Sequence, residues 1–437
     1  MTNLRLLGGV LTAFLASCGV CAHAQSVITL EQIFATAETN SRQLRPSLTA
    51  ISEAEQEVNV ARAERLPDIN ASLSLSYIGD GFTTKRNFGD YQKAPIPHFG
   101  NGLSVGITQP LYTGGAITSS IDLAELKLTA ARYANDFQRD NIRFQLAGYY
   151  LDIYKYANLR SVVDSNLAAA RKVLGEMRAR YDQGTALLND ITRYELLVSN
   201  LELQLIQIDN TRAILNNNLV TIGGLTEGTV IEPDTTILER VLPKENADWW
   251  QTEAAANSPR LSLARSEVAM SRKAESLAKS ELLPKVGVQA CWTIDGPILV
   301  EVPPINRNLS YWYVGVGVSY NLSSLYKGRR NVAKSRVTSQ KAVENLAAAA
   351  EDLSMSVSAD HIRYLEAYEE LKTQEKSVEL AERNYGIVST RYSADMALIT
   401  DLLDAANARL DAGQRLVNAR INIIYYYYKL LFTAGKI

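Results

Sequence analysis

Two aspartates near the C-terminus are the first residues whose type and spacing suggest chemistry. Asp401 and Asp404 lie three residues apart at the start of a predicted helix, so their carboxylates share one face of a turn. If identical subunits gather around an axis, these positions form two stacked carboxylate rings, which attract cations and resist closure by mutual repulsion. A simpler interpretation is that both acids stabilise the helix, because negative charge is favoured in a first helical turn.

The other reactive residue types form no recognisable catalytic group. After residue 24 the chain keeps only His98, His361 and Cys291 of its histidines and cysteines, and these are far apart in sequence. Neither a zinc site nor a Cys–His pair therefore has support. Gly223-Gly224 lacks the strand, lysine and hydroxyl residue of a phosphate-binding loop. We expect no enzyme activity, no metal and no cofactor.

Residues 1–24 have the layout of a cleavable secretory signal. Arg5 precedes an apolar run from Leu6 to Ala16, and Ala22-His23-Ala24 has the small-x-small pattern of a cleavage site. The segment Leu15-Ala16-Ser17-Cys18 also resembles a lipobox, and cleavage before Cys18 would leave a lipid-anchored N-terminus. Both alternatives predict that the protein leaves the cytoplasm.

Charge and hydropathy exclude two classes of protein. The 437-residue chain has 45 Lys and Arg against 47 Asp and Glu, and removal of the signal takes away one basic residue and no acid. The resulting net charge near −3, from 44 against 47, gives no electrostatic basis for binding nucleic acid. No uninterrupted apolar run of about 18 residues follows the signal, so a location in a membrane would require β-strands.

Four segments alternate apolar and polar side chains with the period of a strand that has one apolar face. They lie at residues 69–77, 103–108, 285–294 and 312–320. The pattern fits transmembrane strands, and it fits equally a half-buried antiparallel sheet in a soluble domain. Four strands cannot close a barrel, since single-chain barrels have at least about eight. A membrane location therefore predicts that subunits share one barrel, and three subunits would supply twelve strands.

Long helices are predicted after each strand pair. Residues 119–181 contain no proline, which permits a helix of roughly 60 residues, or about 90 Å. A return helix over residues 191–222 carries apolar residues at the 3.5-residue period of coiled coils. A second pair is predicted over residues 331–391 and 401–431, in which Ala406 and Gly413 indicate close helix approach. The seam predicted for its last helix consists of Leu403, Ala406, Leu410, Gly413, Val417, Arg420, Ile424, Tyr427 and Leu431.

The two halves of the chain repeat one plan. Residues 180–191 align without a gap with residues 391–402, and Arg, Tyr, Ala, Leu and Asp recur in register. The repeat divides the chain into segments that we define as follows: a first repeat at 25–222 (short helices, strand pair 68–112, long helices 115–222), an equatorial connector at 223–248, and a second repeat at 249–437 (short helices, strand pair 285–321, long helices 329–434).

Several short motifs resemble those of the TolC-like outer-membrane efflux factor family, and the resemblance covers essentially the whole mature chain. The motifs are Ile28-Thr29-Leu30-Glu31-Gln32, Arg65-Leu66-Pro67, Thr108-Gln109-Pro110-Leu111-Tyr112-Thr113-Gly114-Gly115 and the two Arg-Tyr motifs at the helix tips. The resemblance implies a mainly α fold with β, in which long antiparallel coiled-coil helices form a trimeric α-barrel in the periplasm. Four strands per chain would complete a twelve-stranded transmembrane β-barrel in the outer membrane.

The resemblance also implies a function and partners. The protein would be the outer-membrane channel of a tripartite efflux or secretion system, a passive homotrimeric exit duct in outer-membrane lipid. It would dock a periplasmic adaptor, or membrane fusion protein, and an inner-membrane transporter of RND or ABC type. The alternative from another class is a soluble periplasmic coiled-coil adaptor or structural protein whose small sheet packs in its own core.

The resemblance assigns gate residues to the periplasmic helix tips. Asp401 and Asp404 match the entrance carboxylates of the family. Tyr392 and Asp190 match positions that hold the tips closed through a hydrogen bond between helix pairs, although Asp190 could equally be the N-cap of a helix beginning at Ile191. Some relatives carry an arginine that locks the gate with a salt bridge, where this chain has an alanine, Ala397. We therefore expect a weaker polar lock.

Adaptor docking is predicted at the same tips. Gly184 matches the glycine against which the adaptor's hairpin ends are thought to dock, and Asp395 holds the corresponding place in the second tip. A glycine permits close backbone approach and positive φ. It is equally the common residue of a helix–helix turn.

Overall fold

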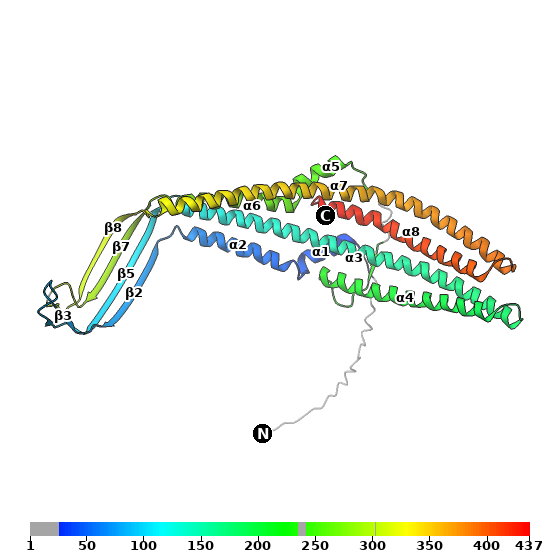
Figure 1. Ribbon diagram of the computed structural model, residues 1–437, viewed down its shortest axis with the longest axis horizontal. Helices are drawn as coiled ribbons and strands as arrows, with labels where there is room; N and C mark the ends of the chain where they lie inside the picture. The colour runs from blue at the N-terminus through cyan, green and yellow to red at the C-terminus, as the bar shows by residue number, and fades with distance from the viewer. Residues whose placement is uncertain (1–25, 235–241, 302) are drawn as a thin grey trace, which may run out of the picture.

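A computed structural model describes residues 26–234, 242–301 and 303–437. The molecule is elongated, with a small sheet at one end, long helices through the body and two helix–helix turns at the other end (Figure 1). The predicted signal peptide, Cys18 included, and residues 235–241 of the predicted connector lie outside the described residues. Within the described ranges, no helix is both long enough and apolar enough to cross a membrane.

The four predicted strands form one antiparallel sheet at the end of the molecule. Their hydrogen-bonded order is β2 (Asp68–Tyr77), β5 (Phe99–Tyr112), β7 (Lys285–Gly296) and β8 (Leu309–Ser319). The two halves of the chain therefore meet along β5 and β7, and β2 and β8 are the open edges. β5 begins before the predicted Leu103, because its preceding residues still pair with β2. A ribbon of β3 (Gly81–Thr83) and β4 (Gln92–Ala94) extends the loop between β2 and β5.

The strand register gives the sheet an apolar face and a polar face. Residues that are paired across neighbouring strands lie on the same face. One row of the apolar face consists of Ala71, Val105, Trp292 and Trp312. The adjacent row on the polar face consists of Ser72, Ser104, Thr293 and Tyr311. β2 is exposed along its whole length and Trp312 is 73% exposed, so one chain leaves much of its apolar sheet surface uncovered.

Four helices continue the strands in the same lateral order. They are α2 (Arg45–Ala63), α3 (Ala116–Asp182), α6 (Pro259–Ser280) and α7 (Ser324–Ser393), each in contact with the next. The long helices α3 and α7 contain 67 and 70 residues, as expected from segments free of proline. Gly114, with φ of 66°, precedes α3 at a point where a Cβ atom would lie 2.8 Å from the backbone oxygen of Ser280. Only a glycine allows this contact between α3 and α6.

Two return helices complete the body, α4 (Leu188–Gly223) packed on α3 and α8 (Ile399–Thr433) packed on α7 and α3. On α4 the predicted seam is largely buried, at Ile191, Tyr194, Val198, Leu201, Ile208 and Leu219. On α8 most of the fully buried residues lie one position before the predicted seam, because α8 packs against two helices and turns a different face inward. Of the predicted seam, Ile424 is fully buried, and Leu403 and Leu410 pack half-buried in the cluster near the tips. The buried residues of α8 include Leu402, Ala405, Ala412, Ala419, Ile423 and Leu430. The close approach predicted at Gly413 is confirmed, since a Cβ there would lie 3.0 Å from Val162 Cγ1 on α3.

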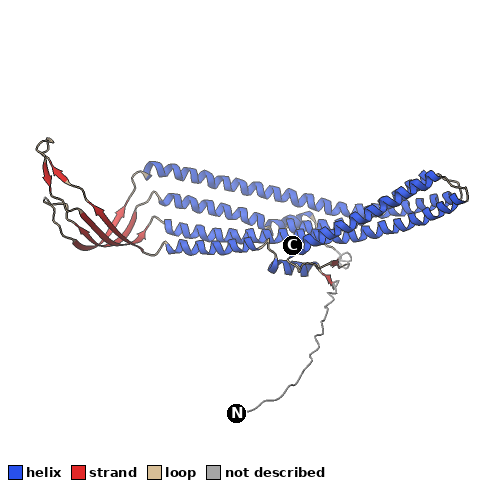
Figure 2. Ribbon diagram, turned by 90° about the horizontal axis from the view of Figure 1, so that it is seen from below, coloured by secondary structure: helices blue, strands red, loops and turns tan. Residues whose placement is uncertain are grey.

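A small strand pair at mid-body was not predicted. β1 (Ser26–Ile28) pairs in parallel with β6 (Ile231–Pro233), just before the short helix α1 (Leu30–Asn40), and the strands are drawn at mid-body in Figure 2. The other short helix, α5 (Ala247–Asn257), packs against α7. The buried Tyr150 of α3 fixes this pair, because its hydroxyl donates to the Ile28 carbonyl at 3.0 Å and accepts from the Asp234 N–H at 2.6 Å. Burial raises the pKa of Tyr150. The start of the described chain is thereby joined to the connector and to the middle of α3.

Candidate functional site at the helix tips

The two helix–helix turns at the far end are built alike. In the first, the Thr185 N–H donates to the Arg180 carbonyl at 2.9 Å, and in the second the Met396 N–H donates to the Arg391 carbonyl at 2.8 Å. The residue before each donor has a left-handed backbone, with φ of 77° at Gly184 and 59° at Asp395. Both are C-terminal turns of the Schellman type, in which glycine is the usual left-handed residue.

The interior of the tips is a shared apolar cluster from all four long helices. It buries Met177 of α3, Tyr194 of α4 and Leu402 of α8, and Tyr392 of α7 packs against it half-buried. Burial raises the pKa of Tyr194, and a hydrogen bond with Tyr385 of α7 raises it further. The two helix pairs are therefore packed together down to the last turns before the tips.

Asp401 and Asp404 lie exposed in the first turns of α8, on the same side of the helix. The Asp401 carboxylate accepts a hydrogen bond from the Leu398 N–H at 3.1 Å, so it caps the start of the helix. The simpler helix-stabilising role is thus present at Asp401. The carboxylate rings need further copies of the chain and stay a prediction.

Asp190 and Tyr392 are close enough to interact. Burial raises the pKa of Tyr392, and the neighbouring Asp190 carboxylate raises it further. Among the described residues of one chain no hydrogen bond joins the two side chains. Because α4 begins at Leu188 and not at Ile191, Asp190 lies in its first turn, and the N-cap interpretation of this residue is wrong.

A polar tie between the two tips was missed by the sequence analysis. Arg180, at the end of α3, donates to the Asp395 carboxylate at 2.9 Å and to the Ser393 carbonyl. Its guanidinium carbon also lies 6.0 Å from the centre of the Tyr392 ring. The two tips of one chain are therefore joined by an ion pair at positions other than Ala397. The signal that could have revealed it is the aspartate at the position where the first tip has Gly184.

A second polar contact between α8 and α3 lies further from the tips. Arg409 of α8 donates from Nε and from a terminal nitrogen to Asn166 Oδ1 of α3, at 3.0 Å and 2.7 Å. Its guanidinium carbon stands 4.0 Å from the centre of the Tyr385 ring of α7. Three of the four helices meet at this arginine.

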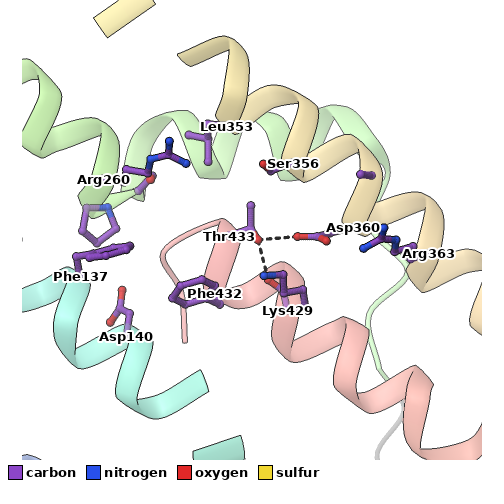
Figure 3. A pocket seen from close by; sticks show the side chains of 13 residues that line it. Phe137, Asp140, Arg260, Leu353, Ser356, Asp360, Arg363, Lys429, Phe432 and Thr433 are labelled. Atoms are coloured by element: carbon purple, nitrogen blue, oxygen red, sulfur yellow. Dashed lines mark hydrogen bonds between the residues drawn. The ribbon is translucent and has the colours of Figure 1, made fainter. Parts of the chain in front are cut away.

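A cavity of about 410 Å³ lies at mid-body, between α3, α6, α7 and α8. Figure 3 shows Thr433 beside Asp360, to which its hydroxyl donates at 2.7 Å, with Phe137 and Phe432 nearby. Burial raises the pKa of Asp140, another lining residue. The lining mixes both signs of charge with aromatic rings, and the threonine–aspartate bond joins the end of α8 to α7.

The residues considered for catalysis are separated in the fold. Cys291 is a free thiol on β7, while His98 and His361 each lie beside a backbone carbonyl oxygen, of Ile78 at 2.8 Å and of Glu245 at 3.2 Å. In the described ranges, no group of three or more His, Cys, Asp or Glu residues could hold a metal ion.

Comparison with known proteins gives a consistent result. The sequence profile of the family described as outer membrane efflux protein matches residues 34–225 and 250–427. The pyoverdine export outer membrane protein OpmQ of Pseudomonas aeruginosa is 22% identical over 92% of this chain and 84% of that protein. The outer membrane efflux protein BepC of Brucella suis biovar 1 is also 22% identical, over 93% and 85%. The crystal structure of the outer membrane protein VceC of Vibrio cholerae superposes with a TM-score of 0.75 at 16% identity, covering 93% of this chain and 96% of that one.

Proposed function

This chain belongs to the outer membrane efflux protein family, and from that premise we propose that three copies form the passive outer-membrane exit channel of a tripartite efflux or secretion system. The observation that carries the proposal is the sheet with two open edges. All three strand pairings are antiparallel, so β8 and β2 run in opposite directions. Pairing β8 of one copy with β2 of the next continues the alternation and closes a barrel of twelve strands after three copies. Closure would pair the backbone groups that an open edge leaves exposed.

The two faces of the sheet fit the two environments of such a barrel. The exposed apolar row that ends at Trp312 suits lipid, and the polar row that contains Ser72 and Ser104 suits a wet lumen. The serine hydroxyls lie 2.8 Å apart, so the polar face also forms bonds between its own strands. This division supports a membrane location over a soluble sheet that packs in its own core.

The helical body has matching exposed apolar residues on its two outer helices. Helix contacts place α3 and α8 in the middle, with α4 and α7 at the sides. α4 exposes Leu196, Leu203 and Ile206, and α7 exposes Leu380 and Ile387. Exposed apolar stripes of this kind mark contact surfaces. We assign them to neighbouring copies, so that α4 of one copy packs on α7 of the next and twelve helices form the α-barrel.

The tips form the periplasmic entrance in this proposal. Asp401 and Asp404 form the carboxylate rings, and Tyr392 with Asp190 contributes to holding the tips closed. Gly184 and Asp395 are the docking points of a periplasmic adaptor, which connects the channel to an inner-membrane transporter of RND or ABC type. A Cβ at Gly184 would meet no atom within 4 Å, which leaves room for an approaching backbone.

Cell fractionation and conductance measurement test the proposal together. The untagged mature protein is expected in outer-membrane fractions and, after purification in detergent, as trimers that conduct ions across planar bilayers. Recovery of the protein in the soluble periplasmic fraction would contradict the channel and favour the adaptor alternative. Substitution of the two carboxylates provides the separate test of the entrance rings, described below.

A further inference from the structure

The segment that carries the two entrance aspartates is tied to α3 at both of its ends. Asp395 precedes Asp401 and is bonded to Arg180, while Arg409 follows Asp404 and is bonded to Asn166. We propose that the two arginines are positioning residues for the entrance, the contact of Arg180 serving as a latch and that of Arg409 as a pivot. The inference rests on the proposed channel function and assigns the parts that hold its entrance carboxylates in place.

The backbone conformation of Asp395 supports the latch, because an aspartate is less favourable than a glycine at a left-handed turn position. Gly184 takes the left-handed conformation of the first turn without steric cost, whereas the second turn places an aspartate there. A glycine at position 395 would satisfy the turn and leave Arg180 without a carboxylate. Asp395 reaches Arg180 at 2.9 Å, across the gap between the two helix pairs. The side chain is thus explained by the contact across the tips and not by the turn.

The exposure of the latch allows it to open. The Asp395 side chain is 81% exposed and the Arg180 side chain 31% exposed, so water can replace each partner when the tips separate. Arg180 has further contacts that would be lost in the same movement, namely the Ser393 carbonyl and the face of Tyr392. Outward movement of the α7–α8 tip away from α3 must break this whole group.

The pivot lies where the helices are better packed. Arg409 is half-buried. Its partners are Asn166 Oδ1 and the Tyr385 ring, on two other helices. Arg409 follows Asp404 by five residues, or about 7.5 Å along the helix. Because Arg409 stays bonded to α3 at that distance, the tip of α8 can move outward while the rest of the helix keeps its position in the body.

Open probability of the full-length trimer in planar bilayers tests the latch. Asp395→Gly keeps the left-handed turn and removes the carboxylate, and Arg180→Ala removes the other partner. Each is expected to raise the open fraction by roughly two- to fivefold, the equivalent of one exposed ion pair. The double variant Arg180→Glu with Asp395→Arg, which restores opposite charges, is expected to return the open fraction toward that of the unmodified channel.

The matched control is Arg178→Ala. Arg178 lies two residues before Arg180 and pairs with Glu195 at 2.6 Å, but this pair joins α3 to α4 within one hairpin. Its loss is expected to leave the open fraction unchanged. Equal behaviour of Asp395→Gly and Arg178→Ala would overturn the latch, and so would failure of the charge-reversed pair to restore closure. If the unmodified trimer conducts no current, the proposed channel function itself fails, which is a different result.

The pivot is tested by cation block and not by opening alone. Arg409→Lys keeps the positive charge but cannot place two nitrogens on Asn166 Oδ1. We expect the concentration of a trivalent cobalt ammine that halves the current to rise by about threefold or more, because the entrance carboxylates lose their alignment. Block identical to that of the unmodified channel would overturn the pivot. Asn166→Leu, which removes the acceptor and keeps Arg409, is expected to give the same shift.

Discussion

Trp292 and Trp312 are paired directly across β7 and β8, on the apolar face of the sheet. The next residue pair along these strands, Thr293 and Tyr311, lies on the opposite, polar face. Position 312 and position 311 are therefore neighbours in sequence with opposite surroundings in the proposed barrel. This alternation allows the membrane location to be tested with two substitutions of the same kind.

We expect Trp312→Arg to reduce the yield of folded trimers, because a charged side chain on the lipid face destabilises a barrel by up to about 2–4 kcal/mol, depending on its depth in the bilayer. Tyr311→Arg places the same charge on the polar face and should assemble close to normally. The measurement is the fraction of protein that migrates as SDS-resistant trimer in unheated gels. Equal losses in both variants would contradict the assignment of the two faces.

The entrance rings predict a loss of cation block. Asp401→Asn with Asp404→Asn removes the carboxylate charge, while the amide oxygen at position 401 can still accept from the Leu398 N–H. The half-blocking concentration of a trivalent cation should rise at least about tenfold in single-channel recordings. Asp411→Asn, which removes an exposed acid paired with Arg415 further along α8, is the control and should leave the block unchanged.

Close packing of α8 on α3 predicts a steric effect at Gly413. A Cβ there would lie 3.0 Å from Val162 Cγ1, so Gly413→Val should lower the free energy of unfolding by about 1–3 kcal/mol. Gly175→Ala in α3 is the control, because a Cβ at that position meets nothing within 4 Å. That variant should be stabilised by about 0.5–1 kcal/mol through helix propensity. Urea unfolding followed by circular dichroism measures both.

The buried carboxyl of Asp140 predicts a pH dependence of stability. Burial raises its pKa in the folded protein above the value of 3.8. The protonated form is thus favoured by folding, and its stabilising contribution is complete below about pH 4 and lost as the pH rises through the folded-state pKa. Asp140→Asn should remove this loss and increase the free energy of unfolding at pH 7. Asp164→Asn, at an exposed position of the same helix, is the control and should leave the free energy of unfolding at pH 7 unchanged.

Local periodicity was sufficient to predict most of the elements. The alternation around Trp312 predicted β8, and the absence of proline between residues 119 and 181 predicted the long helix α3. Both predictions were possible because each pattern lies within a single continuous segment of the chain. The seam of α8 was displaced for a tertiary reason. The coiled-coil pattern used for the prediction assumes one partner helix. α8 packs against both α7 and α3, so the face that it buries is different.

Contacts between residues far apart in the sequence could not be predicted from local sequence patterns. Arg180 and Asp395 are 215 positions apart, and neither residue type indicates a partner. The pairing of β1 with β6 involves strands of three residues each, which are too short to show a period. Asp401 and Asp404 could be proposed as entrance residues from their spacing and the resemblance, whereas the contacts of Arg180 and Arg409 on either side of them required the packed arrangement of α3 and α8.

The bond between Tyr150 and the Ile28 carbonyl limits how far the N-terminal chain can reach. Tyr150 lies roughly 50 Å along α3 from Ala116, where the helix leaves the sheet. The ten residue-to-residue steps from Cys18 to Ile28 span at most about 36 Å when fully extended. A lipid on Cys18 would therefore have to cover the remaining distance of roughly 14 Å with its own acyl chains to enter a bilayer that surrounds the sheet. If the chain is cleaved after residue 24, Cys18→Ser should leave the protein in the outer membrane in unchanged amount, whereas a lipid anchor on Cys18 predicts a reduced amount.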